Sequence, residues 1–135
     1  MSERKILIVE DDNDLRELIE QHLTSLGLNA TGAATISEAQ KLIENEDDRY
    51  DIILTDLNLK DGEKGIDLAA WTRKLENSYK AKARFILMTG YHSDFDEKLA
   101  HSYGINLFLN KPFDPNLLEE QILFLLNDMN QQIAV

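Results

Sequence analysis

Three short apolar runs constrain the fold of this chain more than any other feature of its sequence. They occupy residues 6–9, 52–54 and 85–88, and the first is rich in β-branched residues. Runs of this length suit strands that are covered on both faces, as in a parallel sheet with helices on each side. A polar residue follows each run directly, so each strand is expected to end there.

Amphipathic segments separate the apolar runs. Apolar side chains follow helical spacing in five segments: 13–26, 37–46, 68–75, 95–103 and 118–129. Two weaker strands are expected at 29–32 and 107–109, and Asn13 is the expected N-cap of the first helix. Five strands alternating with five helices predict a flavodoxin-like α/β fold, a doubly wound (βα)5 sandwich whose five-stranded parallel sheet has helices on both faces. One domain over residues 1–130 and a short frayed tail over 131–135 are expected.

Composition narrows the function. Fourteen Lys and Arg residues against 25 Asp and Glu residues give a net charge of −11, which argues against direct nucleic-acid binding. The chain has no cysteine, so disulfides and thiolate metal sites are excluded. The apolar run near the N-terminus is too short for a signal peptide or a membrane span. A cytoplasmic protein without membrane contact is expected.

The polar residues that end the predicted strands are expected to meet at one edge of the sheet. Glu10 and Asp11 follow the first strand, Asp56 the third and Thr89 the fourth, and Lys111 follows the fifth. Ligands bind beyond the carboxyl ends of the strands in open parallel α/β sheets. Converging carboxylates repel one another unless a hard cation lies among them, and all-oxygen ligation suits Mg²⁺ or Mn²⁺.

This set of side chains suits attack of a carboxylate on a phosphoryl group. Such a reaction needs neutralisation of the negative charge on the equatorial phosphoryl oxygens more than it needs a general base. Asp56 is the natural nucleophile, the metal ion covers one oxygen and the ammonium group of Lys111 a second. The hydroxyl group of Thr89 and backbone N–H groups cover the third.

Four segments resemble a response-regulator receiver domain of two-component signalling: 6–12, 51–58, 88–90 and 111–113. The resemblance extends over essentially the whole chain. It implies a switch that takes a phosphoryl group from a histidine kinase or a histidine phosphotransfer protein onto Asp56. As catalysis it implies only the domain's own phosphorylation and slow autodephosphorylation. The resemblance does not imply a downstream protein target. It does imply an output surface, which consists of the fourth and fifth helices and the strand between them.

The same resemblance assigns the metal and phosphate contacts. Asp11 and Asp56 are implied to bind the metal ion directly, and Glu10 through a water molecule. Asn58, two residues after Asp56, is implied to offer its backbone carbonyl group. Lys111 is implied to contact the phosphoryl group, and the bond that follows it, to proline, is usually cis in the family.

Switching and lifetime are assigned to a second group of residues. Thr89 and Phe108 match the family's hydroxyl and aromatic switch pair. Gly90 matches a position where a small residue leaves room for the phosphoryl group. Tyr91 and Asn58 flank the path of an attacking water molecule, so they are expected to set the lifetime of the phosphorylated state.

Two features of the sequence depart from the family pattern. Lys60 occupies the position four residues past the acceptor where proline is most frequent, and the following glycine is displaced by one, to Gly65. The loop that begins at Lys60 is therefore expected to differ in conformation.

The last predicted helix has two apolar residues away from its inward-facing stripe. Leu117 and Phe124 lie far around the helix from that stripe. Two interpretations stay open: the pair contacts a partner or a second copy in a phosphorylation-dependent homodimer, or it consists of scattered surface hydrophobic residues of the ordinary kind.

Three alternatives carry different functions. A pseudo-receiver would share the fold and act as an interaction module independent of phosphorylation. A cofactor-binding flavodoxin-like protein would need a hydroxyl- and glycine-rich first loop, whereas this loop is acidic. A phosphohydrolase with an aspartyl intermediate usually has a second acid two residues after the nucleophile, where this chain has Asn58.

Overall fold

Five parallel strands form a sheet at the centre of this protein. The computed structural model describes residues 4–45, 49–90 and 96–134. The strands are β1 (Lys5–Val9), β2 (Asn29–Ala33), β3 (Ile52–Asp56), β4 (Arg84–Thr89) and β5 (Leu107–Asn110). Their order in the sheet is β2-β1-β3-β4-β5, and every neighbouring pair is parallel. This is the order of flavodoxin-like doubly wound sheets, so the predicted fold class is confirmed.

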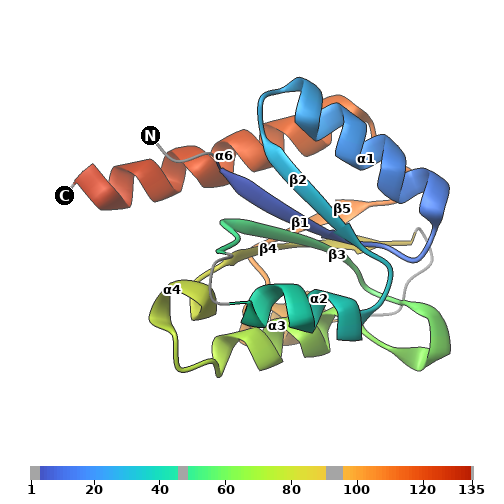
Figure 1. The fold of residues 1–135 in the computed structure, drawn as a ribbon, viewed down its shortest axis with the longest axis horizontal. Helices are drawn as coiled ribbons and strands as arrows, with labels where there is room; N and C mark the ends of the chain where they lie inside the picture. Colours follow the sequence, from blue (N-terminus) through green and yellow to red (C-terminus); the bar gives the residue numbers. More distant parts are fainter. Residues whose placement is uncertain (1–3, 46–48, 91–95, 135) are drawn as a thin grey trace.

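Helices cover both faces of the sheet (Figure 1). They are α1 (Asn13–Ser25), α2 (Ile36–Glu44), α3 (Gly65–Arg73), α4 (Ser78–Ala81), α5 (Glu97–Ser102) and α6 (Pro115–Ala134), with a 3-10 turn, η1, at Lys60–Gly62. One face packs against α1 and α6, and the other against α2, α3 and α5. Among the described residues, no helix has the length and apolar character that crossing a membrane would require.

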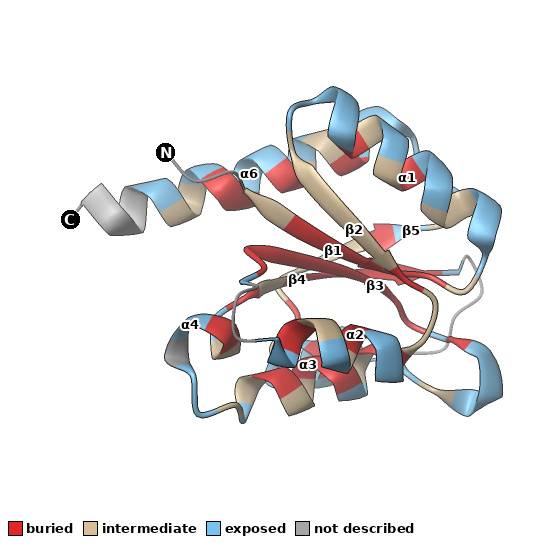
Figure 2. Cartoon of the chain, viewed as in Figure 1, coloured by how far each residue is buried: buried red, intermediate tan, exposed pale blue. Residues whose placement is uncertain are grey.

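Side chains along the central strands point alternately to the two faces of the sheet, and this divides the core into two layers. Leu7 and Val9 of β1 pack on the side of α2 and α3, whereas Ile6 and Ile8 pack on the side of α1 and α6. The same alternation holds in β3 and β4, and all three strands are buried along almost their whole length (Figure 2). Burial on both faces explains why the sequence of each is a continuous apolar run.

The observed helix starts correct one prediction. The N-cap of α1 is Asp12 and not Asn13, because the backbone of Asp12 is extended and its carboxylate accepts hydrogen bonds from the N–H groups of Asp14 and Leu15. In α5 the N-cap is Asp96. The predicted start of that helix at residue 95 lies outside the described residues.

Two further helical segments differ from the sequence expectations. The short helix α4 was not predicted; its N-cap, Asn77, accepts hydrogen bonds from the N–H groups of Tyr79 and Lys80. At the other end of the chain, the helical backbone of α6 continues through Ala134. The proposed division into residues 1–130 and 131–135 stays a prediction.

The loop after β3 forms a short β-hairpin, which we call the 58–64 hairpin. Asp61 and Gly62 both have positive φ angles, 63° and 76°, as the central residues of a type I′ turn require. Asn58 and Lys64 form an antiparallel bridge across the hairpin. The Asp61-Gly62 pair is a strong sequence signal for such a hairpin, which was not among the predicted elements.

Gly65 fixes where α3 begins next to the end of β3. A Cβ atom at this position would lie 2.2 Å from the carbonyl oxygen of Asp56 and 2.9 Å from the side chain of Thr55. Only glycine permits so close an approach without a backbone shift. The hairpin therefore leaves β3 and returns to a fixed point directly next to Asp56.

Arg73 ties together three segments at the edge of the sheet opposite Asp56. Its guanidinium group donates hydrogen bonds to the carbonyl oxygens of Ala81, Ala83 and Gly104. It also lies over the ring of Phe85, 5.3 Å from the centroid. One side chain on α3 thus provides hydrogen bonds to backbone carbonyl groups in the loop before β4 and in the turn after α5.

Replacement of Arg73 by alanine is expected to lower the free energy of unfolding by about 2 to 3 kcal/mol, because partly buried carbonyl groups lose a charged donor. Urea denaturation followed by circular dichroism measures the change. Lys74→Ala is the matched control, since Lys74 is the exposed neighbour of Arg73, and a change within about 0.5 kcal/mol is expected for it. Equal stability of the two variants would contradict this role of Arg73.

Candidate functional site

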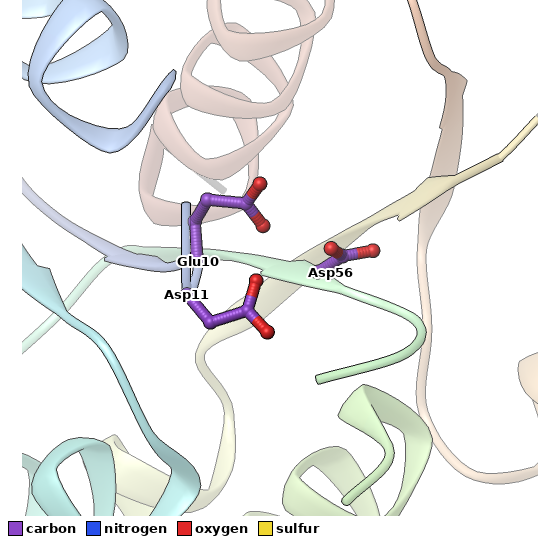
Figure 3. Close-up of side chains that lie close together, drawn as sticks. All are labelled: Glu10, Asp11 and Asp56. Atoms are coloured by element: carbon purple, nitrogen blue, oxygen red, sulfur yellow. The ribbon is translucent and has the colours of Figure 1, made fainter. Parts of the chain in front are cut away.

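Three carboxylates converge where β1 and β3 end. Glu10 and Asp11 directly follow β1, and Asp56 is the last residue of β3. One carboxylate oxygen from each residue lies within 4.8 Å of the others. Figure 3 shows the side chains of Glu10 and Asp11 extending from the end of β1 toward Asp56. From β1 the chain adds β2 on one side of the sheet and β3, β4 and β5 on the other, so the strand order reverses between β1 and β3. Ligands bind at this point in doubly wound sheets.

Lys111 lies against this acidic cluster. Its Nζ atom is 2.7 Å from Glu10 Oε1 and 2.8 Å from Asp56 Oδ2. Burial acting alone would lower the pKa of Lys111, but its hydrogen bonds to Asp56 and Glu10 outweigh burial and raise this pKa above its usual value. The lysine therefore stays protonated and offsets part of the negative charge.

Glu10 is the most buried member of the cluster, with 1% of its surface exposed. Burial raises the pKa of Glu10 to about 7, and the neighbouring carboxylate of Asp56 acts in the same direction, while Lys111 opposes both. The second carboxylate oxygen of Glu10, Oε2, is buried and has no hydrogen-bond partner among the described residues. A buried oxygen of this kind calls for a further cationic or protic partner.

The donor set fits a hard divalent cation. Its members are three carboxylates at adjacent strand ends, and one of them has an oxygen without a hydrogen-bond partner in the described part of the chain. Mg²⁺ and Mn²⁺ prefer oxygen ligands, and Mg²⁺ is commonly held by one or two carboxylates together with water and substrate phosphate. Glu10, Asp11 and Asp56 are the residues that would hold such an ion.

Thr89 and Lys111 are fixed to each other where β4 and β5 end. The backbone N–H group of Lys111 donates to the carbonyl oxygen of Thr89 at 2.7 Å. The hydroxyl group of Thr89, which is fully buried, donates to Asn110 Oδ1 at 2.8 Å. The peptide bond between Lys111 and Pro112 is cis. These contacts hold the backbone from which Lys111 extends toward Asp56.

Phe108 is held from two sides. Its ring packs against the core on the side of α2 and α3, and it meets the ring of His101 edge-on at a centroid distance of 4.9 Å. On α6, Gln121 donates from Nε2 to the carbonyl oxygen of Phe108 at 2.8 Å. This half-buried phenylalanine of β5 therefore contacts both α5 and α6.

The remaining predicted residues lie around the site or away from it. Asn58 and Gly90 are exposed next to the ends of β3 and β4, and Tyr91 lies outside the described residues. Leu117 and Phe124 are exposed on α6, at 44% and 62% of their surface. The roles that the resemblance assigns to these residues stay predictions.

Arg16 is a site residue that the sequence analysis missed. Its Nη1 atom donates to the carbonyl oxygen of Glu10 at 2.7 Å, and Nη2 donates to Asn13 Oδ1 at 2.7 Å. The side chain thus holds the acidic loop against the first turn of α1. A basic residue one turn into the helix after an acidic loop was the available signal.

Comparison with known proteins agrees with this geometry. Residues 6–123 match the response regulator receiver domain family. The response regulator protein PilR of Pseudomonas aeruginosa is 34% identical over 122 residues, which are 90% of this chain and 26% of PilR. An uncharacterized 14.6 kDa protein of Leptolyngbya boryana is 30% identical over 85% of this chain and 84% of its own length. The chain spans 26%, 62% and 49% of the first three curated relatives that it matches.

A solved structure supports the same assignment. The CheY-like response regulator receiver domain protein of Methanospirillum hungatei JF-1 has a TM-score of 0.85 and 30% sequence identity, with 97% of this chain and 99% of that chain covered. The acidic cluster of Glu10, Asp11 and Asp56 lies at the switch point of this fold. The chain therefore belongs to the response regulator receiver domain family of two-component systems.

Proposed function

We propose that Asp56 accepts a phosphoryl group from a histidine kinase or a histidine phosphotransfer protein in a reaction that requires Mg²⁺ or Mn²⁺. The observation that carries the proposal is the pair of contacts from Lys111 to Glu10 and Asp56, next to the third carboxylate of Asp11. The family supports it, because phosphorylation by histidine kinases is a general property of receiver domains.

In this reaction a carboxylate oxygen of Asp56 attacks phosphorus. The new bond joins that oxygen to phosphorus, the bond between phosphorus and the donor's imidazole nitrogen breaks, and its electron pair returns to the imidazole. Lys111, now bound to Asp56 Oδ2, is positioned to move onto a phosphoryl oxygen. A bound divalent cation would supply further charge neutralisation at the phosphoryl oxygens.

Removal of the phosphoryl group requires water at the exposed side of Asp56. Asn58 is two residues after Asp56 and is exposed, and strand alternation gives the two side chains the same face. We assign it, with Tyr91, to the control of the phosphorylated lifetime, and we assign to Gly90 the space that the phosphoryl group needs. The only catalysis in this proposal is the domain's own phosphorylation and slow autodephosphorylation.

Output is assigned to the surface formed by α5, β5 and α6. Phe108 on β5 contacts both helices through His101 and Gln121, so movement of this residue would reach both. Thr89 is the last residue of β4, the strand that neighbours β3 and Asp56, and it would transmit phosphorylation to Phe108. Leu117 and Phe124 are exposed on α6 and are the proposed contact with a protein target or a second copy.

A pseudo-receiver that acts by contact alone is the second candidate. The same fold and the same α6 surface would serve it. The ion pairs of Lys111 with Glu10 and Asp56 favour the phosphorylated switch. An interaction module has no need of a buried carboxylate whose second oxygen lacks a partner among the residues that the structure describes. Under either function the chain is proposed to work in the cytoplasm through protein partners and without direct nucleic-acid binding, given its net charge of −11.

Incubation with a small phosphodonor and Mg²⁺ is expected to add one phosphoryl group to the wild-type chain and none to Asp56→Asn, because the amide is a poor nucleophile. Intact-protein mass spectrometry measures the gain. Asp14→Asn, which changes an exposed carboxylate near the same edge, is expected to behave as wild type. No gain in the wild type, or an equal gain in Asp56→Asn, would rule out the proposed acceptor and favour the pseudo-receiver.

Asp11→Asn is expected to weaken Mg²⁺ binding by about tenfold or more, because the site loses one anionic ligand. Isothermal titration calorimetry on the unphosphorylated protein measures this directly. Asp12→Asn is a matched control: Asp12 is exposed and caps α1, and asparagine caps a helix as well as aspartate does. If the two variants bind Mg²⁺ equally, Asp11 is not a ligand.

The double variant Leu117→Ser/Phe124→Ser is expected to lose self-association or target binding of the phosphorylated protein, because it removes two exposed apolar side chains of α6. Sedimentation velocity with and without phosphodonor measures self-association. Leu18→Ser serves as the control, since Leu18 is an exposed leucine on α1. Unchanged association and target binding in the double variant would remove this surface from the proposal.

A further inference from the structure

The 58–64 hairpin brings a lysine next to Asn58. The N–H group of Leu59 donates to the carbonyl oxygen of Glu63, and that of Gly65 donates to the carbonyl oxygen of Leu57, both at 2.9 Å. These two bonds flank Asn58 and Lys64, which therefore form a non-hydrogen-bonded antiparallel pair. Side chains in such a pair leave the same face of the ribbon and are closer together than in any other pairing.

Burial along the first arm of the hairpin identifies that face. Leu57 and Leu59 are buried in the core on the side of α2 and α3. Asn58 lies between them and is exposed, so its side chain leaves the opposite face. Asp56 precedes Leu57 and by the same alternation shares the face of Asn58.

The second arm gives the same answer independently. The carboxylate of Glu63 accepts a hydrogen bond from the N–H group of Ile36, at the start of α2, at 3.4 Å. Glu63 thus faces α2, and its neighbour Lys64 faces the other way. Both arms therefore place Lys64 on the side of the hairpin that carries Asn58 and Asp56.

Lys64 differs from Lys111 in exposure and in contacts. Lys111 is half-buried and bound to Glu10 and Asp56, whereas Lys64 is exposed. Within the described residues its side chain forms no hydrogen bond that caps α3. An ammonium group on a flexible four-carbon stem is therefore present at the rim of a site that holds three carboxylates and the ammonium group of Lys111.

We propose that Lys64 is a specificity-determining residue of the acceptor site, whose ammonium group meets an anionic phosphodonor at the rim and favours donors of higher negative charge. This role rests on the proposed phosphorylation of Asp56. A positive charge at the mouth of a cleft raises the local concentration of anions and speeds their association. The effect weakens as ionic strength rises, because salt screens exposed charges.

Initial rates of Asp56 phosphorylation with Mg²⁺ test the role of Lys64. Acetyl phosphate carries two negative charges at neutral pH and phosphoramidate carries one, so the two donors report the dependence on charge. Lys64→Ala is expected to lower the rate with acetyl phosphate about threefold to tenfold at low ionic strength, and the rate with phosphoramidate less. Lys64→Glu should lower both rates further, and Lys64→Arg should retain the wild-type rate.

The control is Lys82→Ala, which removes the same charge from an exposed lysine at the opposite edge of the sheet. It is expected to leave both rates unchanged, and high salt is expected to abolish the deficit of Lys64→Ala. A wild-type rate in Lys64→Ala at low salt, or a deficit equal for both donors and insensitive to salt, would overturn the role of Lys64. Failure of the wild type itself to be phosphorylated by either donor would instead reject the proposed function of Asp56.

Discussion

The structure depends on the charge balance around Asp56. A carboxylate as buried as Glu10 is costly unless a cation compensates it. Lys111 provides that cation from the loop after β5, on the far side of β4. It binds Glu10, which is 101 residues away in the chain, and Asp56, which is 55 residues away. One ammonium group and one divalent ion together match the negative charges of Glu10, Asp11 and Asp56, which is the physical reason that a metal ion and a lysine suit the same site.

Such a site needs strand ends that are held in place. Beyond the last backbone hydrogen bonds between the strands, side chains hold these ends. Arg16 binds the carbonyl group of Glu10 after β1, Thr89 binds Asn110 between β4 and β5, and Gln121 binds the carbonyl group of Phe108. Each bond satisfies a polar group near the rim of the sheet. The same bonds link the site to α1 and α6, so a change at Asp56 has direct neighbours through which to act.

The sequence predicted the sheet because strands buried on both faces leave continuous apolar runs. It predicted the acidic cluster because parallel strands place their carboxyl ends together. It did not predict α4, because four residues are too few to establish a helical period. Asp12 and Asn13 are equally good N-caps by type, so the choice between them depends on backbone angles. The contacts of Arg16 and Gln121 depend on how helices cross the sheet, which no local pattern encodes.

The 58–64 hairpin shows how such a site can vary without losing its chemistry. Gly65 must stay next to Asp56, because a Cβ atom there would meet the carbonyl oxygen of Asp56 at 2.2 Å. With both ends of the loop fixed, added length can extend only outward, and the Asp61-Gly62 turn directs it into a hairpin. Burial of the leucines in its first arm and the bond from Glu63 to α2 then fix its orientation. A change in loop length therefore alters the rim, where Lys64 lies, and leaves the carboxylates and Lys111 in place.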